Sequence, residues 1–357
     1  MHAVIMAGGR GTRFWPKSRE KKPKHLLDII STRTIVQETL DRIKLLVPTE
    51  NILIVTGKSH ADELTSQLPE IPRNNIIIEP IGRNTAPCIG LAALHIKRKK
   101  IDDVMIVLPA DHLISDVGNF LKILSAATQK ANEGPHLITV GIKPSSPETG
   151  YGYLEQGNII DNINGEIIYK VKSIREKPSL EQAKKFLRQG NFLWNSGMFI
   201  WKTSSILNEI QQWLPDLYNG LISIEKAMET NEEEGFVSDK IYQNIKPISI
   251  DYGVMEKTRH ALLMRGDFGW SDVGSWDALW EISEKDENGN AIKGHFTGLN
   301  AKNSLIHGSQ KLIALIDVED LIIVETQDAI LVCKRGASQK VRKIVEILEN
   351  KGLTKYI

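Results

Sequence analysis

The chain has 357 residues, of which 41% are hydrophobic and 25% charged, the balance of a globular protein with a sizeable core. Lys and Arg number 45 against 44 Asp and Glu, so the net charge of +1 attracts neither nucleic acid nor an anionic membrane. No apolar run approaches the length of a membrane span, and the N-terminus carries no recognisable secretory leader. We therefore expect a cytoplasmic protein with no nucleic-acid or membrane partner.

The first thirty residues predict a strand, over 3–6, that ends in a glycine loop. Glycines let main-chain N–H groups approach a phosphate closely, and Arg13 and Lys24 add positive charge. The loop does not match the dinucleotide fingerprint, which would need a third glycine where Phe14 stands, and it is not a P-loop. The pattern favours a triphosphate site, with a plain surface turn as the alternative. The candidate ligands in the loop are Gly8, Gly9, Gly11, Thr12 and Arg13.

Short apolar runs then alternate with helical patterns as far as residue 131. Runs of four or five apolar residues are typical of strands buried on both faces, and the alternation implies parallel strands with crossover helices. The predicted fold class is α/β. Strands are expected at 52–55, 76–78 and 104–108, and helices at 34–46, 61–68, 85–97 and 120–131.

The spacing becomes irregular beyond a strand at 137–141. We expect polar strands to about residue 175, a helix from Ser179 with a capping box, a buried strand over 192–201 and three helices to about 244. From about residue 292, short β-rich runs at 304–307, 312–316, 321–325 and 329–333 predict a small sandwich, barrel or β-solenoid, followed by a helix over 339–348. The expected domains are 1–285, which is catalytic, and 286–357, which is β-rich.

Two cysteines lie far apart in the chain. Cys88 falls in a predicted helix of the first domain and Cys333 in a predicted strand of the second. We expect both to be reduced and buried, as is usual in the cytoplasm.

Two aspartates are candidate metal ligands. Asp111 follows the predicted strand at 104–108, and the carboxyl ends of the strands are where ligands sit in open α/β sheets. Asp272 lies far along the chain between glycines and aromatic residues. Two carboxylates and a triphosphate can complete the octahedral oxygen shell that Mg²⁺ prefers. Each aspartate alone could equally cap a helix or a turn.

Further polar residues stand at the ends of apolar runs. Glu176 can accept hydrogen bonds from sugar hydroxyls, and Lys177 can hold a second phosphate. Asn195 and Asp251 are similarly placed. Surface salt bridges and turns are the alternative for each. The stretch 84–87 predicts a helix N-terminus, and its polar groups could also contact the edge of a nucleobase.

Eight motifs in this order resemble the sugar-1-phosphate nucleotidylyltransferases, and within them the enzymes that join GMP to mannose 1-phosphate. The resemblance covers roughly residues 1–285 and implies a Rossmann-like, mostly parallel sheet of the GT-A-like type. The motifs are Gly8-Gly-x-Gly-Thr-Arg13 with Pro16, Pro23-Lys24, Asn84-Thr-Ala-Pro87, Leu108-Pro-Ala-Asp-His112, Thr149-Gly-Tyr-Gly152, Glu176-Lys-Pro178, Asn195-Ser-Gly-Met-Phe199 and Gly269-Trp-Ser-Asp-Val-Gly-Ser-Trp276.

The resemblance also implies a role for each matching residue. The nucleotide would be bound by Gly8, Gly9, Gly11, Thr12, Arg13, Lys24, Asn84, Thr85, Ala86, Pro87 and Asp111. The sugar phosphate would be held by Gly152, Glu176, Lys177, Asn195 and Asp251, of which Asp251 is matched by neighbourhood only. Asp111 and Asp272 would bind Mg²⁺, the implied cofactor, and the catalytic cations would be Arg13, Lys24 and Lys177.

The implied activity is transfer of GMP from GTP to mannose 1-phosphate, with GDP-mannose and pyrophosphate as products. The sugar phosphate is already an anion, so no general base is needed, and catalysis reduces to positioning and charge neutralisation. Two alternatives remain open. One is the same chemistry with another hexose- or heptose-1-phosphate or another nucleotide, and the other is a non-catalytic nucleotide-sugar sensor. In relatives, a C-terminal β segment often mediates self-association, so we expect a homodimer.

Overall fold

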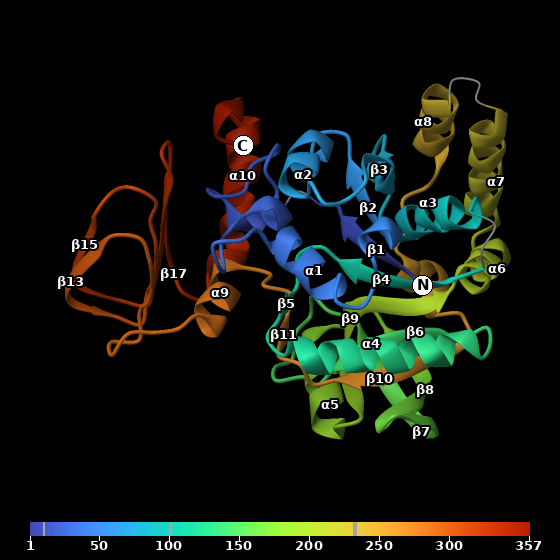
Figure 1. Cartoon of the computed structure of the whole chain (residues 1–357). Helices are drawn as coiled ribbons and strands as arrows, with labels where there is room; N and C mark the ends of the chain where they lie inside the picture. Colours follow the sequence, from blue (N-terminus) through green and yellow to red (C-terminus); the bar gives the residue numbers. More distant parts are fainter. Residues whose placement is uncertain (10, 100–101, 231–233) are drawn as a thin grey trace. The chain divides into compact units, whose positions relative to one another are not determined.

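The computed structural model describes residues 1–9, 11–99, 102–230 and 234–357. Contacts divide the chain into two units, and neither is continuous in sequence. We call residues 1–8, 40–110 and 114–270 the sheet unit, and residues 9–39, 111–113 and 271–357 the solenoid unit. Figure 1 labels most of the helices and strands of both units.

A nine-stranded sheet forms the centre of the sheet unit, in the order β3-β2-β1-β4-β9-β6-β10-β8-β7. Strands β1 to β4 are parallel to one another, which confirms the predicted α/β class. β9 is antiparallel to β4 and β6 on either side of it. The strands are β1 (His2–Ala7), β2 (Ile52–Gly57), β3 (Ile76–Glu79), β4 (Val104–Pro109), β6 (Leu137–Ile142), β7 (Tyr153–Ile163), β8 (Glu166–Arg175), β9 (Phe192–Lys202) and β10 (Ala261–Gly266).

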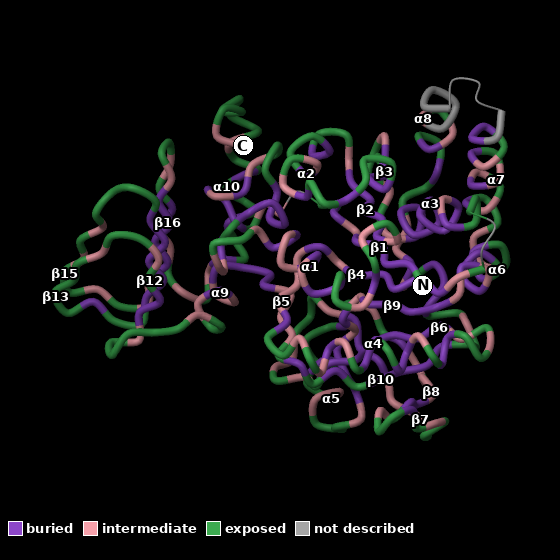
Figure 2. The backbone as a smooth tube through the Cα atoms, in the orientation of Figure 1, coloured by how far each residue is buried: buried purple, intermediate pink, exposed green. Residues whose placement is uncertain are grey.

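Helices cover this sheet. α3 contacts β1 and β2 and also α6 and α7, so most of its residues are buried and Figure 2 shows it largely purple. Ser179 caps α5 through the predicted capping box with Gln182. The helices are α2 (Ala61–Gln67), α3 (Thr85–Lys97), α4 (Val117–Asn132), α5 (Leu180–Gln189), α6 (Thr203–Trp213), α7 (Pro215–Thr230) and α8 (Glu234–Asn244). α1 (Ile35–Ile43) begins in the solenoid unit and ends in the sheet unit, and β5 (Leu113–Ile114) and β11 (Trp270–Ser271) also span the division.

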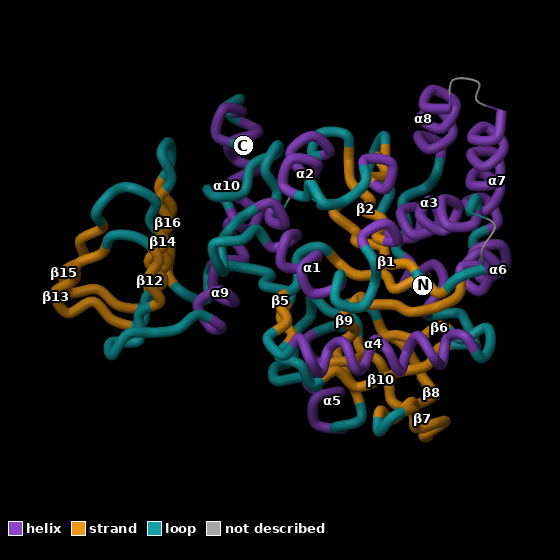
Figure 3. The backbone as a smooth tube through the Cα atoms, viewed as in Figure 1, coloured by secondary structure: helices purple, strands orange, loops and turns teal. Residues whose placement is uncertain are grey.

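The solenoid unit winds its strands into two separate parallel sets. β12 (Ala291–Lys293), β14 (Leu305–His307) and β16 (Leu321–Glu325) form one set, to which β17 (Ile330–Lys334) adds an antiparallel strand. β13 (Phe296–Lys302) pairs with β15 (Ile313–Glu319) in the other. Successive strands from β12 to β16 therefore alternate between the two sets, as Figure 3 shows. Of the three predicted arrangements, the β-solenoid is the one found.

Residues from both ends of the chain form the core of the solenoid unit. The Phe14 and Trp276 rings meet edge to face, with centroids 4.9 Å apart. Trp276 Nε1 donates to the Trp15 carbonyl at 3.0 Å, and Trp15 Nε1 donates to the Tyr356 carbonyl at 2.7 Å. α9 (Trp276–Ile282) and α10 (Val341–Asn350) belong to this core. The segment after the glycine loop is thus anchored by residues more than 250 positions away.

The two cysteines are free, as expected, but differ in burial. Cys88 is buried in α3, whereas Cys333 is only half-buried, so the prediction of two buried thiols is wrong for Cys333. The reason is that β17 is the end strand of its sheet, and alternate residues along it are exposed. Among the helices of the described residues, none has the length and apolar character needed to span a membrane.

Candidate functional site

The glycine loop between β1 and Phe14 has a backbone that requires glycine. Gly9 and Gly11 have φ angles of 96° and 60°, in the left-handed region where a side chain is strained. A Cβ on Gly11 would lie 2.7 Å from the main-chain nitrogen of Lys24, so only glycine allows these two segments to touch. Arg10 lies outside the described residues. Gly8 ends the first segment of the sheet unit, and the rest of the loop belongs to the solenoid unit.

Lys24, Asp111 and Asp272 form what we call the lysine cluster, within the solenoid unit. The ammonium of Lys24 is buried and donates to Asp111 Oδ2 at 2.9 Å, to the Asp111 carbonyl at 2.8 Å and to the Asp272 carbonyl. Burial alone would raise the pKa of Asp111, but the charges of Lys24 and His112 outweigh it and lower this pKa to about 2. The two residues predicted to bind metal are therefore brought together by the lysine predicted to bind phosphate.

The lysine cluster offers suitable oxygens to a magnesium ion. Oxygen atoms of residues 111 and 272 converge on a single cation, the Lys24 ammonium. Gly274 leaves room for the Asp272 carboxylate, since a Cβ there would come within 2.8 Å of Oδ2. No group of three acidic, His or Cys side chains that could hold a metal occurs among the described residues. Mg²⁺ takes one or two carboxylates and completes its shell with phosphates and water, so the predicted site does not require a third acidic side chain.

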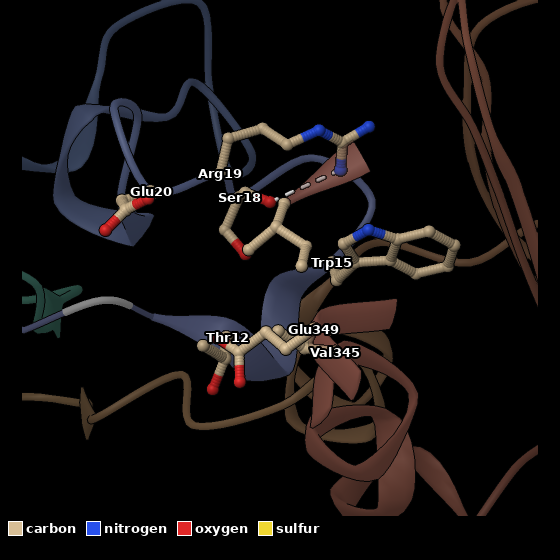
Figure 4. Close-up of a pocket in the computed structure, with 8 residues that line it drawn as sticks. Thr12, Trp15, Ser18, Arg19, Glu20, Val345 and Glu349 are labelled. Carbon is tan, nitrogen blue, oxygen red and sulfur yellow. Dashed lines mark hydrogen bonds between the residues drawn. The ribbon is translucent and has the colours of Figure 1, made fainter. Parts of the chain in front are cut away.

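Arg13 lies against the turn, Ser338–Lys340, that leads into the C-terminal helix α10. Its Nη1 donates to Gln339 Oε1 at 3.3 Å. A cavity of about 670 Å³ opens beside the loop, lined by Gly11, Thr12, Arg13, Gln339, Arg342, Val345, Glu346 and Glu349. A smaller pocket beside it includes Thr12, Trp15, Val345 and Glu349, drawn in Figure 4. Residues of the glycine loop and of α10 therefore line both cavities.

A second group of predicted ligands comes together in the sheet unit, and we call it the acidic cluster: Gly152, Glu176, Lys177, Asn195 and Asp251. Asn195 Nδ2 donates to Asp251 Oδ1 at 2.7 Å, and the Asn195 amide donates to the Gly152 carbonyl at 2.8 Å. A Cβ on Gly152 would come within 2.3 Å of Glu176 Oε2, so glycine is needed there. Asp251 is matched to the family only by its position near other motif residues, and the structure shows that it contacts Asn195 directly.

The carboxylates of the acidic cluster resist ionisation. Burial raises the pKa of Glu176 to about 7, and the nearby charge of Asp251 adds to the effect. Burial likewise raises the pKa of Asp251. Lys177 Nζ lies 3.6 Å from Glu176 Oε1 and is largely exposed, on a residue whose φ of 47° is in the left-handed region. The cluster therefore carries acceptor oxygens beside one exposed cation.

Sequence reasoning missed several residues around the acidic cluster. Glu256 Oε1 accepts the main-chain N–H of Glu176 at 3.1 Å. Tyr151 meets Trp194 and Trp270 edge to face, with ring centroids 5.1 and 5.5 Å apart. Each of the three aromatic residues directly adjoins or lies within a motif that the sequence singled out, which is the signal that could have found them.

The stretch 84–87 begins α3, as predicted. Asn84 has a φ of 71° and caps the helix, with its side chain accepting from the Thr85 amide at 2.8 Å. Ala86 and Pro87 are buried. The hydroxyl of Thr85 points toward residue 250, whose amide it accepts at 2.8 Å. Of the predicted nucleobase-binding residues, Thr85 therefore contacts the residue next to Asp251.

Comparison with known sequences assigns the family. The sequence model for "Nucleotidyl transferase" matches residues 2–289, and that for the "MannoseP isomerase/GMP-like beta-helix domain" matches residues 294–348. The chain belongs to the nucleotidyl transferase family, and its C-terminal part is of the β-helix type. This agrees with the parallel sheet and the solenoid described above.

Individual relatives are similar over nearly the whole chain. A mannose-1-phosphate guanylyltransferase from Klebsiella pneumoniae is 41% identical over 355 residues, which is 99% of this chain and 75% of the relative. One from Escherichia coli shows the same identity and coverage. The crystal structure titled mannose-1-phosphate geranyltransferase from Thermus thermophilus has a TM-score of 0.84 at 29% identity, and the match covers 98% of this chain and 99% of that one.

Proposed function

We propose that the protein transfers GMP from GTP to mannose 1-phosphate, releasing GDP-mannose and pyrophosphate. The observation that carries this proposal is 41% identity, over 99% of the chain, to proteins named mannose-1-phosphate guanylyltransferase. The charged groups that we assign to the reaction are all present in this chain, and Arg13 of the glycine loop is one of them. In the lysine cluster they are Lys24, Asp111 and Asp272, and in the acidic cluster Glu176, Lys177 and Asp251.

In the proposed mechanism, an oxygen of the sugar phosphate attacks the α-phosphorus of GTP in line. A new P–O bond forms, the bond to the β-phosphate oxygen breaks, and its electron pair leaves with pyrophosphate. The nucleophile is already an anion, so no side chain needs to remove a proton. The protein's task is to hold two mutually repelling anions together and to stabilise the charge that develops on the leaving group.

We assign the nucleotide to the glycine loop and the lysine cluster. Gly8, Gly9, Gly11 and Thr12 offer main-chain N–H groups to the phosphates, and Arg13 and Lys24 stabilise the departing pyrophosphate. Asp111 and Asp272 would hold Mg²⁺, which when bound neutralises phosphate charge. The residues proposed to border the guanine are Asn84, Thr85, Ala86 and Pro87.

We assign mannose 1-phosphate to the acidic cluster. Glu176, Asn195 and Asp251 offer acceptors and an amide donor for sugar hydroxyls, and Lys177 fixes the attacking phosphate. Gly152 allows close approach at this point because it has no side chain. The aromatic rings of Tyr151, Trp194 and Trp270 add apolar area near these polar groups.

A panel of nucleotides and sugar phosphates with pyrophosphate detection tests the proposal. We expect the highest kcat/KM for GTP with mannose 1-phosphate. A preference for UTP, dTTP or another hexose- or heptose-1-phosphate would instead establish the same chemistry on another substrate. Tight binding of GDP-mannose without pyrophosphate release would indicate the nucleotide-sugar sensor.

The raised pKa of Glu176 predicts a pH dependence. A carboxyl with a pKa of about 7 is mostly neutral at pH 6 and mostly ionised at pH 8, and the ionised form is the better acceptor for sugar hydroxyls. Ionisation of Glu176 by itself should therefore raise the kcat/KM for mannose 1-phosphate about tenfold between these pH values, because this quantity reports groups of the free enzyme. Steady-state kinetics across the range measures it.

Glu176→Gln is the control for this profile, because it keeps the shape of the side chain and cannot ionise. Its profile should be shallower and should show only the titration of the substrate phosphate, whose second pKa is about 6. An unchanged slope in the variant would assign the pH dependence to another group.

We also propose a homodimer formed through the solenoid. Leu299 on β13 stands beside Ile316 on β15, and the two side chains are 66% and 64% exposed. Adjacent exposed apolar residues on a paired strand surface are typical of an interaction site. Replacing both residues by Lys should shift the sedimentation coefficient from that of a dimer to that of a monomer. Ile159→Lys, at an exposed position on β7, is the matched control, and a dimer that survives the double change would contradict this interface.

A cytoplasmic location, without nucleic-acid or membrane partners, completes the proposal. Both cysteines are free, as expected in a reducing compartment, and the net charge of +1 gives no general attraction for polyanions.

A further inference from the structure

Three hydrogen bonds tie the start of α3 to residues 248–250 of the sheet unit. The Ile248 amide donates to the Arg83 carbonyl at 3.2 Å, and the Ala86 amide donates to the Ile248 carbonyl at 3.1 Å. In the third bond, the Ile250 amide donates to the hydroxyl oxygen of Thr85 at 2.8 Å. The first two bonds join main-chain atoms, whereas the third depends on a side chain.

The amide of Ile250 has particular need of this acceptor. Ile250 is 0% exposed, and a buried N–H group without an acceptor is costly because water cannot replace the bond. The acceptor is the hydroxyl oxygen of Thr85, at the start of α3. The position of the Ile250 main chain therefore depends on the Thr85 hydroxyl.

The chain that follows Ile250 carries two carboxylates to the acidic cluster. Asp251 begins a short helical segment, Asp251–Met255, and its Oδ1 accepts from Asn195 at 2.7 Å. Glu256, just beyond that segment, accepts the amide of Glu176 at 3.1 Å. A displacement of Ile250 would consequently move both of these contacts.

We infer that Thr85 is a positioning residue for the sugar phosphate, which it serves by holding the main chain that places Asp251 against Asn195. This inference rests on the proposed function and concerns the Thr85 side chain alone, whose hydroxyl oxygen accepts from Ile250, whereas the main chain of Thr85 stays with its motif at the guanine. Small displacements of groups that position a substrate weaken its binding, so the sugar phosphate should be affected more than the nucleotide.

Thr85→Val tests the inference because it keeps the branched shape of the side chain and removes the acceptor oxygen. The KM for mannose 1-phosphate should rise about tenfold, the size of one ordinary hydrogen bond, while the KM for GTP stays within about twofold of wild type. Thr85→Ser keeps the hydroxyl and should restore both constants to within about twofold of wild type. An unchanged KM for mannose 1-phosphate, or an equal rise in both constants, would overturn the inference.

A measurement on the wild-type protein does not depend on the variant folding. Hydrogen exchange at the Ile250 amide should slow on addition of mannose 1-phosphate alone, because ligand on the acidic cluster restrains the main chain that carries Asp251. Exchange that does not respond would overturn the role of Thr85. Wild-type protein that releases no pyrophosphate from GTP and mannose 1-phosphate would overturn the proposed function instead.

Discussion

Replacing Lys24 by methionine is expected to lower both catalysis and stability. The side chain is buried, and its ammonium bonds the carboxylate and carbonyl of Asp111 and the carbonyl of Asp272. Methionine fills a similar volume but leaves these three oxygens without their donor. The free energy of unfolding should fall by about 3 kcal/mol, the low end for breaking a buried ion pair, because Asp111 is partly exposed.

The same change removes a cation that we place on the pyrophosphate, so kcat should fall by about 10² to 10³. Urea denaturation and steady-state kinetics measure the two effects separately. Lys22→Met is the matched control, because Lys22 is an exposed lysine two residues away and should leave both quantities near wild type. A Lys24→Met variant with stability within about 1 kcal/mol of wild type and kcat within about threefold would refute this role.

Asp111→Asn should abolish Mg²⁺-dependent turnover. The change keeps the size of the side chain but removes the negative charge that we expect to hold the ion, so kcat at saturating Mg²⁺ should fall by about 10³ or more. Because the pKa of Asp111 is about 2, this carboxylate is ionised at every pH used in an assay. The loss should therefore appear equally at pH 6 and pH 8.

Titration of activity with MgCl₂, together with calorimetric binding of Mg²⁺ in the presence of GTP, checks this prediction. Asp62→Asn, at an exposed position in α2, is the control and should bind Mg²⁺ as the wild type does. Undiminished turnover in Asp111→Asn would end the two-carboxylate proposal.

The Asp111 carboxylate also makes the free energy of unfolding depend on pH, in a direction that its lowered pKa fixes. A lowered folded-state pKa stabilises the protein above about pH 4, and this contribution is lost as the pH falls toward 2.

Deleting the C-terminal β-rich segment would disturb more than self-association, because residues of this segment also hold the glycine loop. Trp276 and Tyr356 bond Trp15, next to the glycine loop, and Arg13 bonds Gln339. Deleting the residues after 285 would remove two of these three partners of the loop as well as the proposed dimer interface. Point changes on the exposed face of β13 and β15 are therefore the cleaner test of self-association.

Local pattern determined most of the secondary structure. Periodicity and capping signals placed α3 at its observed bounds, 85–97, and the capping box at Ser179. The alternation of apolar runs and helices also indicated the parallel strands β1 to β4, because strands buried on both faces are continuous apolar runs. The direction of β9 could not be predicted in this way, since an apolar run is the same whether its neighbours are parallel or antiparallel.

Strands with few apolar residues could not be predicted from the local sequence pattern. β13 is mostly exposed, so it lacks the alternation that marks a half-buried strand, and neither it nor β12 was predicted. The choice among sandwich, barrel and solenoid depends on which strands pair, and strand spacing alone left all three open. The pairing of β12 with β14 and of β13 with β15 decides it.

The sequence by itself determined which residues are the candidates for the chemistry, because the motifs name the glycine loop, the two aspartates and the members of the acidic cluster. Only the tertiary structure decided which of them touch. It places Lys24 against both Asp111 and residue 272, joins Asp251 to Asn195, and turns Thr85 toward Ile250. Such contacts join residues 56 to 248 positions apart, and they are set by the packing of whole elements, which no local pattern of residues records.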